Sequence, residues 1–298
     1  MKILLATDGS ENSAGAARFV TRLNLASDDE VTIFHAIYGL PCLYGRKVYY
    51  DALEAMKKET APVTLDSAMD ILGTVKAKIS TLIMDGFPVS CIIDASVESG
   101  IDLIVLGAKG INSGESYFIG SVTRAVAIQS PKPVLVIKVT KSEQTGGTKI
   151  LFATDGSEHS AATAGILSEI PFPLGTAITI LNVIPWEFLD IPKEYVPDIN
   201  ERFNEIIEET GSKRLIESKR IFEQTREYLK NNFTDMRELL KFGEPQTEIM
   251  RASEDLSADL LAVGCRGLRG IKGMMGSVSR NILEESKCSV LIGNTSKK

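Results

Sequence analysis

One ten-residue stretch decides the fold of this chain, because it occurs twice. Lys2-Ile-Leu-Leu-Ala-Thr-Asp-Gly-Ser-Glu11 returns as Lys149-Ile-Leu-Phe-Ala-Thr-Asp-Gly-Ser-Glu158, 147 positions further along the chain of 298 residues. In each copy a short apolar run meets an Asp-Gly-Ser turn, which is typical of a strand that ends and gives way to a helix. The repetition predicts two copies of one structural unit.

Two further repeats support the duplication. Residues 102–110 match residues 259–267 at an offset of 157, and residues 120–124 match residues 276–280 at an offset of 156. A length of about 150 residues is ordinary for one domain. We therefore expect one domain at residues 1–140, a hydrophilic Gly-Gly-ended linker at 141–147 and a second domain at 148–298.

Short apolar runs alternate with helical patterns in both halves. Nearly continuous apolar runs indicate strands that are buried on both faces, and their alternation with helices indicates right-handed parallel βαβ units. The sequence therefore predicts α/β architecture, with two tandem doubly wound, Rossmann-like parallel-sheet domains. The runs lie at 3–7, 31–37, 103–106, 134–139, 150–154, 177–184, 260–263 and 290–292.

One helix shows the clearest periodicity. Apolar residues recur every three or four positions from Leu65 through Met69, Leu72 and onward to Leu82, and Pro62 stands just before them. Proline is favoured in the first turn of a helix. We expect a helix that begins near Pro62 and runs through Leu82 against the sheet.

Composition narrows the classes of function. Hydrophobic residues make up 44% and charged residues 24%, and the net charge is −6 with no Lys/Arg run, which argues against a nucleic-acid partner. No window has the roughly 18 apolar residues of a membrane span. The four cysteines are scattered, and with two histidines they predict neither a disulfide framework nor a metal site. A cytoplasmic protein is expected.

The candidate site lies just after the strands. Ligands of open parallel sheets bind beyond the carboxyl ends of the strands, where strand order reverses. Asp8 and Asp155 follow the first strand of each half, and Gly107-x-x-Gly110 and Gly264-x-x-Gly267 follow the fourth. Each glycine loop leads to a Gly-Ser pair that opens a helix. Glycine backbone and helix N-termini suit phosphate groups.

These motifs resemble those of the universal stress protein family in its tandem form. The family's nucleotide-binding members carry Gly-x2-Gly-x9-Gly-Ser/Thr, which the first half has from Gly107 to Ser121. The second half, from Gly264 to Ser277, is one residue shorter. The resemblance covers essentially the whole chain and also includes Phe34-His35-Ala36, at the end of the second strand.

The resemblance implies an adenine nucleotide, ATP or AMP, with Mg²⁺ as an accompanying ion. It puts Asp8 and Asp155 at the adenine and ribose end, the loop glycines at ribose and phosphate, and the Gly-Ser pairs at the terminal phosphates. The implied nucleotide-binding residues are Asp8, Ala36, Gly107, Gly110, Gly120, Ser121, Asp155, Val183, Gly264, Gly267, Gly276 and Ser277.

Structural roles remain open for the same residues. Asp-Gly-Ser after a strand is also a turn and helix cap, and Gly-Ser before a helix is also a cap. His35 lies in an apolar strand, which favours a hydrogen-bonded core histidine. Cys265 lies in a glycine loop with no histidine or second cysteine near it in sequence, which favours an inert thiol.

The two loops differ in charge. The first carries Glu115 between its glycines, with Lys109 and Arg124 as nearby cations, whereas the second carries Arg269 and Lys272. Spacing therefore favours the first site and charge favours the second.

Three functions follow as hypotheses. The leading one is a non-catalytic, nucleotide-binding stress-response regulator with an unidentified protein partner. The alternatives are a nucleotide-independent interaction scaffold and a slow ATP hydrolase, and no catalytic residue is assigned.

Two structural predictions complete the interpretation. The last strands of the two halves lie near 133–137 and 289–292 and would be exposed apolar edges if the halves stood apart. We therefore expect them to pair with each other, so that the two halves form an internal pseudo-dimer. A further homodimer of the whole chain stays open.

The family's strand order is 3-2-1-4-5, and the first half is ten residues shorter between its first and fourth strands. We expect Cys91–Gly100 to form the crossover helix, and the third strand to be truncated to a stub near Pro88–Ser90 or missing.

Overall fold

The computed structural model describes residues 1–38, 47–110, 119–139, 146–185, 201–267 and 275–294. Most of the expected linker, the glycine-loop residues Glu115, Arg269 and Lys272, and the chain end lie outside these ranges. In both halves, strands and helices alternate as predicted, which confirms the tandem α/β fold.

The first half runs through nine elements. In order they are β1 (Lys2–Ala6), α1 (Glu11–Thr21), β2 (Glu30–Ile37), α2 (Lys47–Leu72), β3 (Lys78–Asp85), α3 (Pro88–Glu98), β4 (Leu103–Gly107), α4 (Ser121–Gln129) and β5 (Val134–Ile137).

The second half repeats this order. Its elements are β6 (Lys149–Ala153), α5 (Glu158–Glu169), β7 (Ala177–Ile184), α6 (Glu201–Leu229), β8 (Asp235–Phe242), α7 (Pro245–Asp255), β9 (Leu260–Gly264), α8 (Ser277–Glu285) and β10 (Ser289–Gly293).

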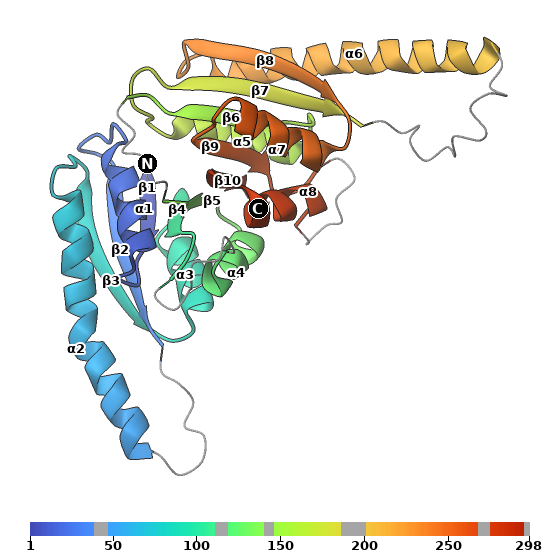
Figure 1. Cartoon of the computed structure of the whole chain (residues 1–298). Helices are drawn as coiled ribbons and strands as arrows, with labels where there is room; N and C mark the ends of the chain where they lie inside the picture. Colours follow the sequence, from blue (N-terminus) through green and yellow to red (C-terminus); the bar gives the residue numbers. More distant parts are fainter. Residues whose placement is uncertain (39–46, 111–118, 140–145, 186–200, 268–274, 295–298) are drawn as a thin grey trace.

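The ten strands within the described ranges form one sheet, in the order β3-β2-β1-β4-β5-β10-β9-β6-β7-β8 (Figure 1). Pairing is parallel within each half, and β5 and β10 pair antiparallel, with Leu135 opposite Leu291. The expected pairing of the two last strands is confirmed. Both apolar edges are covered, and β3 and β8 become the outer edges of the joint sheet.

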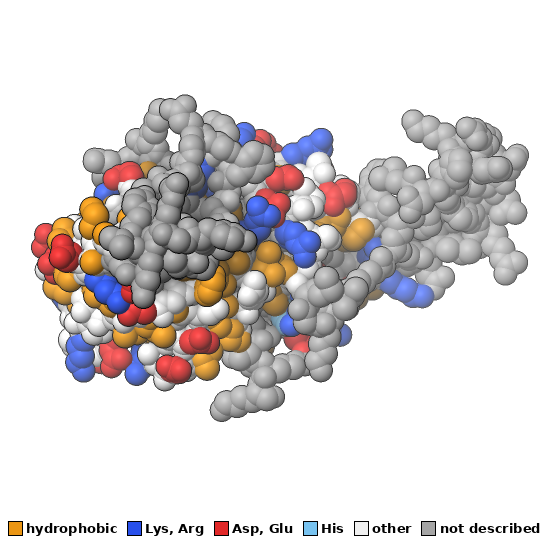
Figure 2. Space-filling model, turned by 90° about the horizontal axis from the view of Figure 1, so that it is seen from below, with side chains coloured by type: hydrophobic (Ala, Val, Ile, Leu, Met, Phe, Trp, Pro, Cys, Tyr) orange, Lys and Arg blue, Asp and Glu red, His pale blue; other side chains and the backbone are white. Residues whose placement is uncertain are grey.

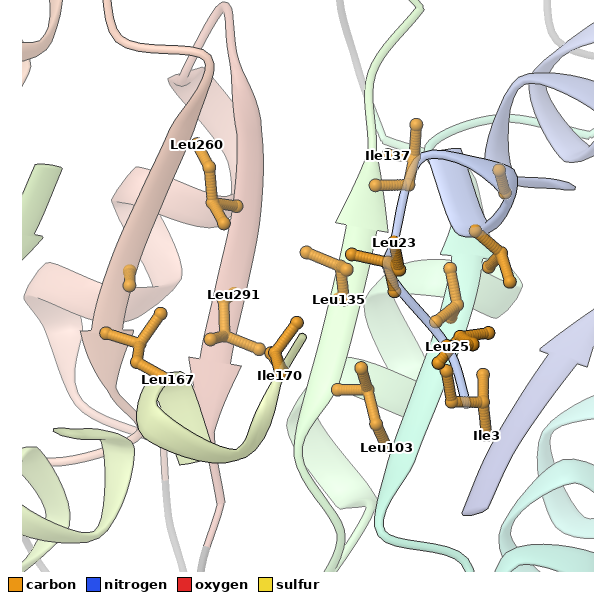
Figure 3. Packing of buried hydrophobic residues seen from close by; sticks show 14 of the residues in the cluster. Ile3, Leu23, Leu25, Leu103, Leu135, Ile137, Leu167, Ile170, Leu260 and Leu291 are labelled. Atoms are coloured by element: carbon orange, nitrogen blue, oxygen red, sulfur yellow. The ribbon is translucent and has the colours of Figure 1, made fainter. Parts of the chain in front are cut away.

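Helices cover both faces of the sheet. Side chains of α1, α2, α5 and α6 contribute to one hydrophobic cluster, and those of α3, α4, α7 and α8 to the other. Leu135 and Leu291 lie in the first cluster with Leu23 from one half and Ile170 from the other (Figure 3). The core is therefore continuous across the junction of the halves.

Two equivalent polar residues also cross this junction. Lys138, just after β5, donates from Nζ to the carbonyl oxygens of Leu283, at 3.2 Å, and Ser286, near the end of α8. Asn294 follows β10 directly. Its Nδ2 donates to the carbonyl oxygen of Ala127 in the last turn of α4, at 3.3 Å, and to that of Lys132 just after this helix, at 3.2 Å. Each half thus satisfies carbonyl groups at the end of the other half's last helix.

The prediction of a truncated third strand is wrong. β3 spans Lys78–Asp85 and pairs with β2 over eight positions, as β8 pairs with β7. The offset between the halves is 147 at Glu30 and Ala177, where β2 and β7 begin, and 157 at Lys78 and Asp235, where β3 and β8 begin. The ten missing residues therefore fall between the second and third strands, not after the third.

The expected helix through Leu82 is also wrong at both ends. α2 begins at Lys47, so Pro62 lies inside it, and the helix stops at Leu72. Pro62 is on the exposed side, where water can satisfy the carbonyl that its missing N–H leaves unpaired. Ile79 and Leu82 belong to β3, an edge strand with five exposed and three half-buried residues. Such a strand lacks the continuous apolar sequence of a strand that is buried on both faces. The crossover helix itself is confirmed as α3, which begins at Pro88.

Charges of both signs are interspersed on the described surface. Figure 2 shows Lys and Arg side chains next to Asp and Glu side chains, with hydrophobic side chains between them. Within the described residues no helix is long and apolar enough to cross a membrane.

Candidate functional site

The candidate site of the first half begins at the turn after β1. The backbone N–H of Ser10 donates to Asp8 Oδ1 at 3.0 Å, and Gly9 takes a positive φ of 80° that completes the turn. Ser10 is the N-cap of α1, and its hydroxyl accepts from the N–H of Ser13 at 3.2 Å. The cap expected as a structural alternative is therefore present. It holds the Asp8 carboxylate at the carboxyl end of the sheet.

The second half reproduces this turn. The N–H of Ser157 donates to Asp155 Oδ1 at 3.0 Å, Gly156 has φ 76°, and Ser157 caps α5 by accepting from Ser160 at 3.3 Å. Identical local sequences thus build identical geometry, with one carboxylate at each site.

The second glycine of each loop meets this carboxylate. A Cβ on Gly110 would lie 2.5 Å from Asp8 Oδ2, and one on Gly267 would lie 2.6 Å from Asp155 Oδ2. Such distances are too short for any side chain, so the backbone of each loop lies directly against the carboxylate. The structure therefore brings together the residues that the sequence placed after the first and fourth strands.

The first glycine of each loop has a packing role. A Cβ on Gly107 would lie 2.5 Å from the carbonyl carbon of Asn12, and one on Gly264 would lie 2.9 Å from the backbone nitrogen of Ser160. Both contacts are with the first turn of the helix that follows the first strand of that half. These glycines let β4 and β9 end against α1 and α5.

The third glycine of each motif has more room than the first two. Gly120 is the N-cap of α4 with φ −64° and ψ 151°, a conformation open to any residue, and its Cβ would meet nothing closer than 3.5 Å. Gly276, the N-cap of α8, has φ −66°, and its Cβ would meet Ser279 Oγ at 3.3 Å. The missing side chains leave these helix N-termini uncovered from that side.

Both helices are fixed to the glycine loops. The N–H of Gly120 donates to the carbonyl of Ala108 at 2.8 Å, and Thr123 Oγ1 donates to the carbonyl of Gly107 at 2.8 Å. In the second half, Gly276 and Ser279 donate to the carbonyl of Cys265, each at 2.8 Å. Ser121 and Ser277, the first helical residues, are exposed beside these anchors.

The second strands add residues of two kinds. Ala36 and Val183 occupy equivalent, half-buried positions near the ends of β2 and β7. The preceding residues anchor the site: His35 Nδ1 lies 2.8 Å from the carbonyl oxygen of Thr7, and Asn182 Nδ2 donates to that of Thr154 at 2.7 Å. The interpretation of His35 as a hydrogen-bonded histidine is supported.

Sequence reasoning missed the role of Asn182. It lies 147 positions after His35, at the offset of the first repeat, and that offset was the available signal. Its side chain is buried and accepts a 2.7 Å hydrogen bond from Ser218 Oγ of α6. Asn182 thus connects α6, through Ser218, to Thr154 at the end of β6.

One cation near the first site takes part in an ion pair. Arg124 of α4 forms an ion pair with Glu284 of α8 at 3.7 Å, across the junction of the halves. Glu115, Arg269 and Lys272, on which the comparison of loop charge rests, lie outside the described residues.

The view of Cys265 as a thiol without a histidine nearby is wrong. Its Sγ lies 3.4 Å from His159 Nδ1, in the first turn of α5. The two residues are 106 positions apart in sequence, which is why sequence proximity failed to reveal the pair.

Taken as a class, this is a doubly wound α/β protein with two copies of a glycine-loop site at the carboxyl ends of its strands, where such folds bind ligands. The family model for the universal stress protein family matches residues 1–138 and 147–293, and the chain belongs to this family.

Similar proteins agree with this assignment. A universal stress protein of Thermus aquaticus is 30% identical over 136 residues, which is 46% of this chain and 97% of that protein. One from Methanocaldococcus jannaschii is 29% identical over 147 residues, 48% of this chain and 84% of that protein. The crystal structure of a universal stress protein from Archaeoglobus fulgidus covers 99% of this chain and 96% of its own, with a TM-score of 0.63 and 21% identity, and shares the fold.

Proposed function

We propose that this universal stress protein binds an adenine nucleotide, ATP or AMP, in each half and acts as a non-catalytic stress-response regulator whose partner choice depends on the bound state. One observation carries the proposal. Each half sets a carboxylate against a glycine loop and, beside it, a helix N-terminus that is capped by a glycine.

The residues suit the parts of a nucleotide. Asp8 and Asp155 offer carboxylate oxygens to hydroxyl groups of a ribose, and the unpaired N–H groups at the starts of α4 and α8 suit phosphate oxygens. The exposed hydroxyls of Ser121 and Ser277 lie at the same helix starts. Ala36 and Val183 are apolar surfaces of the kind an adenine ring contacts.

A divalent ion would accompany the nucleotide. Mg²⁺ binds phosphate oxygens and keeps several waters in its coordination shell. The part of the chain that the structure describes contains no group of three or more His, Cys, Asp or Glu side chains that could hold a metal.

Binding is tested by calorimetric titration of the full chain with ATP and with AMP. Gly120→Val and Gly276→Val place a branched side chain at the helix start, and each should abolish binding at its own site, while the double variant should bind nothing. Both backbone conformations accept valine. Because a Cβ on Gly276 would meet Ser279 Oγ at 3.3 Å, circular dichroism checks that each variant keeps the fold.

Gly165→Ala is the matched control, because a Cβ at this position in α5 meets nothing within 4 Å. It should bind like the unchanged chain. Equal affinity in the unchanged chain and the double valine variant would refute the nucleotide sites drawn here. ADP release from ATP above a blank would instead contradict the non-catalytic assignment.

A further inference from the structure

The second half contains a thiol and an imidazole that the proposed nucleotide binding does not use. Cys265 Sγ lies 3.4 Å from His159 Nδ1. Cys265 is the first residue after β9, and His159 is in the first turn of α5. A histidine at this distance can take the proton of a thiol, which is how nucleophilic cysteines are activated.

The thiol also lies next to the start of a helix. The end of β9 lies so close to α5 that a Cβ on Gly264 would be 2.9 Å from the backbone nitrogen of Ser160. Cys265 therefore lies beside the N-terminal, positive end of α5. Its side chain is 6% exposed, so a small reactant is required.

The pair is confined to the second half. The first half has Asn12 where the second has His159, and Ala108 where the second has Cys265. The two similar sites can therefore be compared within one chain, because only the second has a thiol and an imidazole at these two positions.

We propose that Cys265 is a thiol sensitive to hydrogen peroxide, assisted by His159, whose oxidation switches off the second nucleotide site only; the switch rests on the proposed nucleotide binding. The sulfur attacks one peroxide oxygen, an S–O bond forms and the O–O bond breaks. The sulfur is oxidised by two electrons to the sulfenic acid and the peroxide is reduced to water, with the thiol proton passing through His159 to the leaving oxygen.

The position of Cys265 connects this chemistry to the site. Its carbonyl oxygen accepts the hydrogen bonds of Gly276 and Ser279 that fix the start of α8. An added oxygen on a sulfur that is already buried must displace the end of β9 from the first turn of α5. These two segments lead directly to Gly267 and Asp155, so the glycine loop and the carboxylate would separate.

The other described cysteines provide an internal reference. Burial raises the pKa of the Cys91 thiol, and burial also raises that of Cys288. Both are therefore expected to react slowly, because the thiolate is the nucleophile.

The experiment treats the reduced full chain with hydrogen peroxide, traps sulfenic acid with dimedone and follows each cysteine by peptide mass spectrometry. Cys265 should be labelled at least about fivefold faster than Cys91 or Cys288, and His159→Asn, which copies the first half, should slow it about tenfold. Equal labelling rates at the three cysteines, or an unchanged rate in His159→Asn, would overturn the reactive thiol.

The same samples are then titrated with ATP. The reduced chain should bind two equivalents and the oxidised chain one, while Cys265→Ala, which copies Ala108, should keep two after peroxide treatment. Two equivalents in the oxidised chain would refute the switch. If the reduced chain binds none, the proposed function and the switch both fail, and the labelling rates still decide the reactive thiol.

Discussion

Lys138 joins the two halves through a group that titrates near neutral pH. The pKa of this lysine is lowered to about 8, mainly by burial; Cys288 raises the pKa, and the positive charge of Lys109 lowers it. An exposed lysine has a pKa of about 10.4. Lys138→Met keeps the aliphatic stem and removes the titration.

The free energy of unfolding of the unchanged chain should therefore rise with pH relative to that of Lys138→Met. Between pH 8 and about 10.4 the unfolded chain keeps a proton that the folded chain has released, so alkaline conditions favour the folded state. The full slope is about 1.4 kcal/mol per pH unit. Because the side chain is partly exposed, we expect a relative gain of about 1–2 kcal/mol from pH 8 to 9.5.

Urea denaturation followed by circular dichroism at pH 7, 8 and 9.5 measures this difference. Below pH 8 both states are protonated, and the two proteins should then show parallel pH dependence. Cys288→Ala as a common background removes the neighbouring thiol from the comparison. If the free energies of unfolding of the unchanged chain and Lys138→Met changed in parallel up to pH 9.5, Lys138 would keep its proton in the folded chain. That result would refute the reasoning.

The remaining predictions concern the glycines and caps. Gly107→Ala should lower the free energy of unfolding by about 1–3 kcal/mol, because the new Cβ would meet the backbone of Asn12 at 2.5 Å. Gly120→Ala should change it by less than about 0.5 kcal/mol, because a Cβ at that position meets nothing closer than 3.5 Å. Chemical denaturation compares the two, and equal losses would contradict the packing role. Ser10→Ala should cost about 1 kcal/mol through loss of the α1 cap, while Ser10→Asp should keep most of it; a smaller loss for alanine than for aspartate would be the opposite result.

The inner strands could be predicted because apolar residues dominate each of them. β1, β4 and β5 are buried along nearly their whole length, and β2 has buried apolar residues between half-buried ones. β3 could not be found in the same way, since its edge position leaves most of its residues exposed. The repeat still held a signal: Gly86-Phe-Pro88 matches Gly243-Glu-Pro245 at the offset of 157, directly after both third strands.

The residues of the two sites also fall into those that could be predicted from the sequence and those that could not. The strand-end carboxylates and glycines could be found because turns impose local sequence requirements, such as the positive φ of Gly9. Contacts between distant segments had no such signature. The pairing of Cys265 with His159 and the support of Asn182 by Ser218 depend on how α5 and α6 lie against the sheet.

Native mass spectrometry of the freshly purified full chain tests the central claim most directly. The account predicts complexes that carry one or two adenine nucleotides, or that form when ATP or AMP is added, and that fall by one equivalent in Gly120→Val and in Gly276→Val. A chain that retains no nucleotide and takes up none at millimolar ATP or AMP would contradict it.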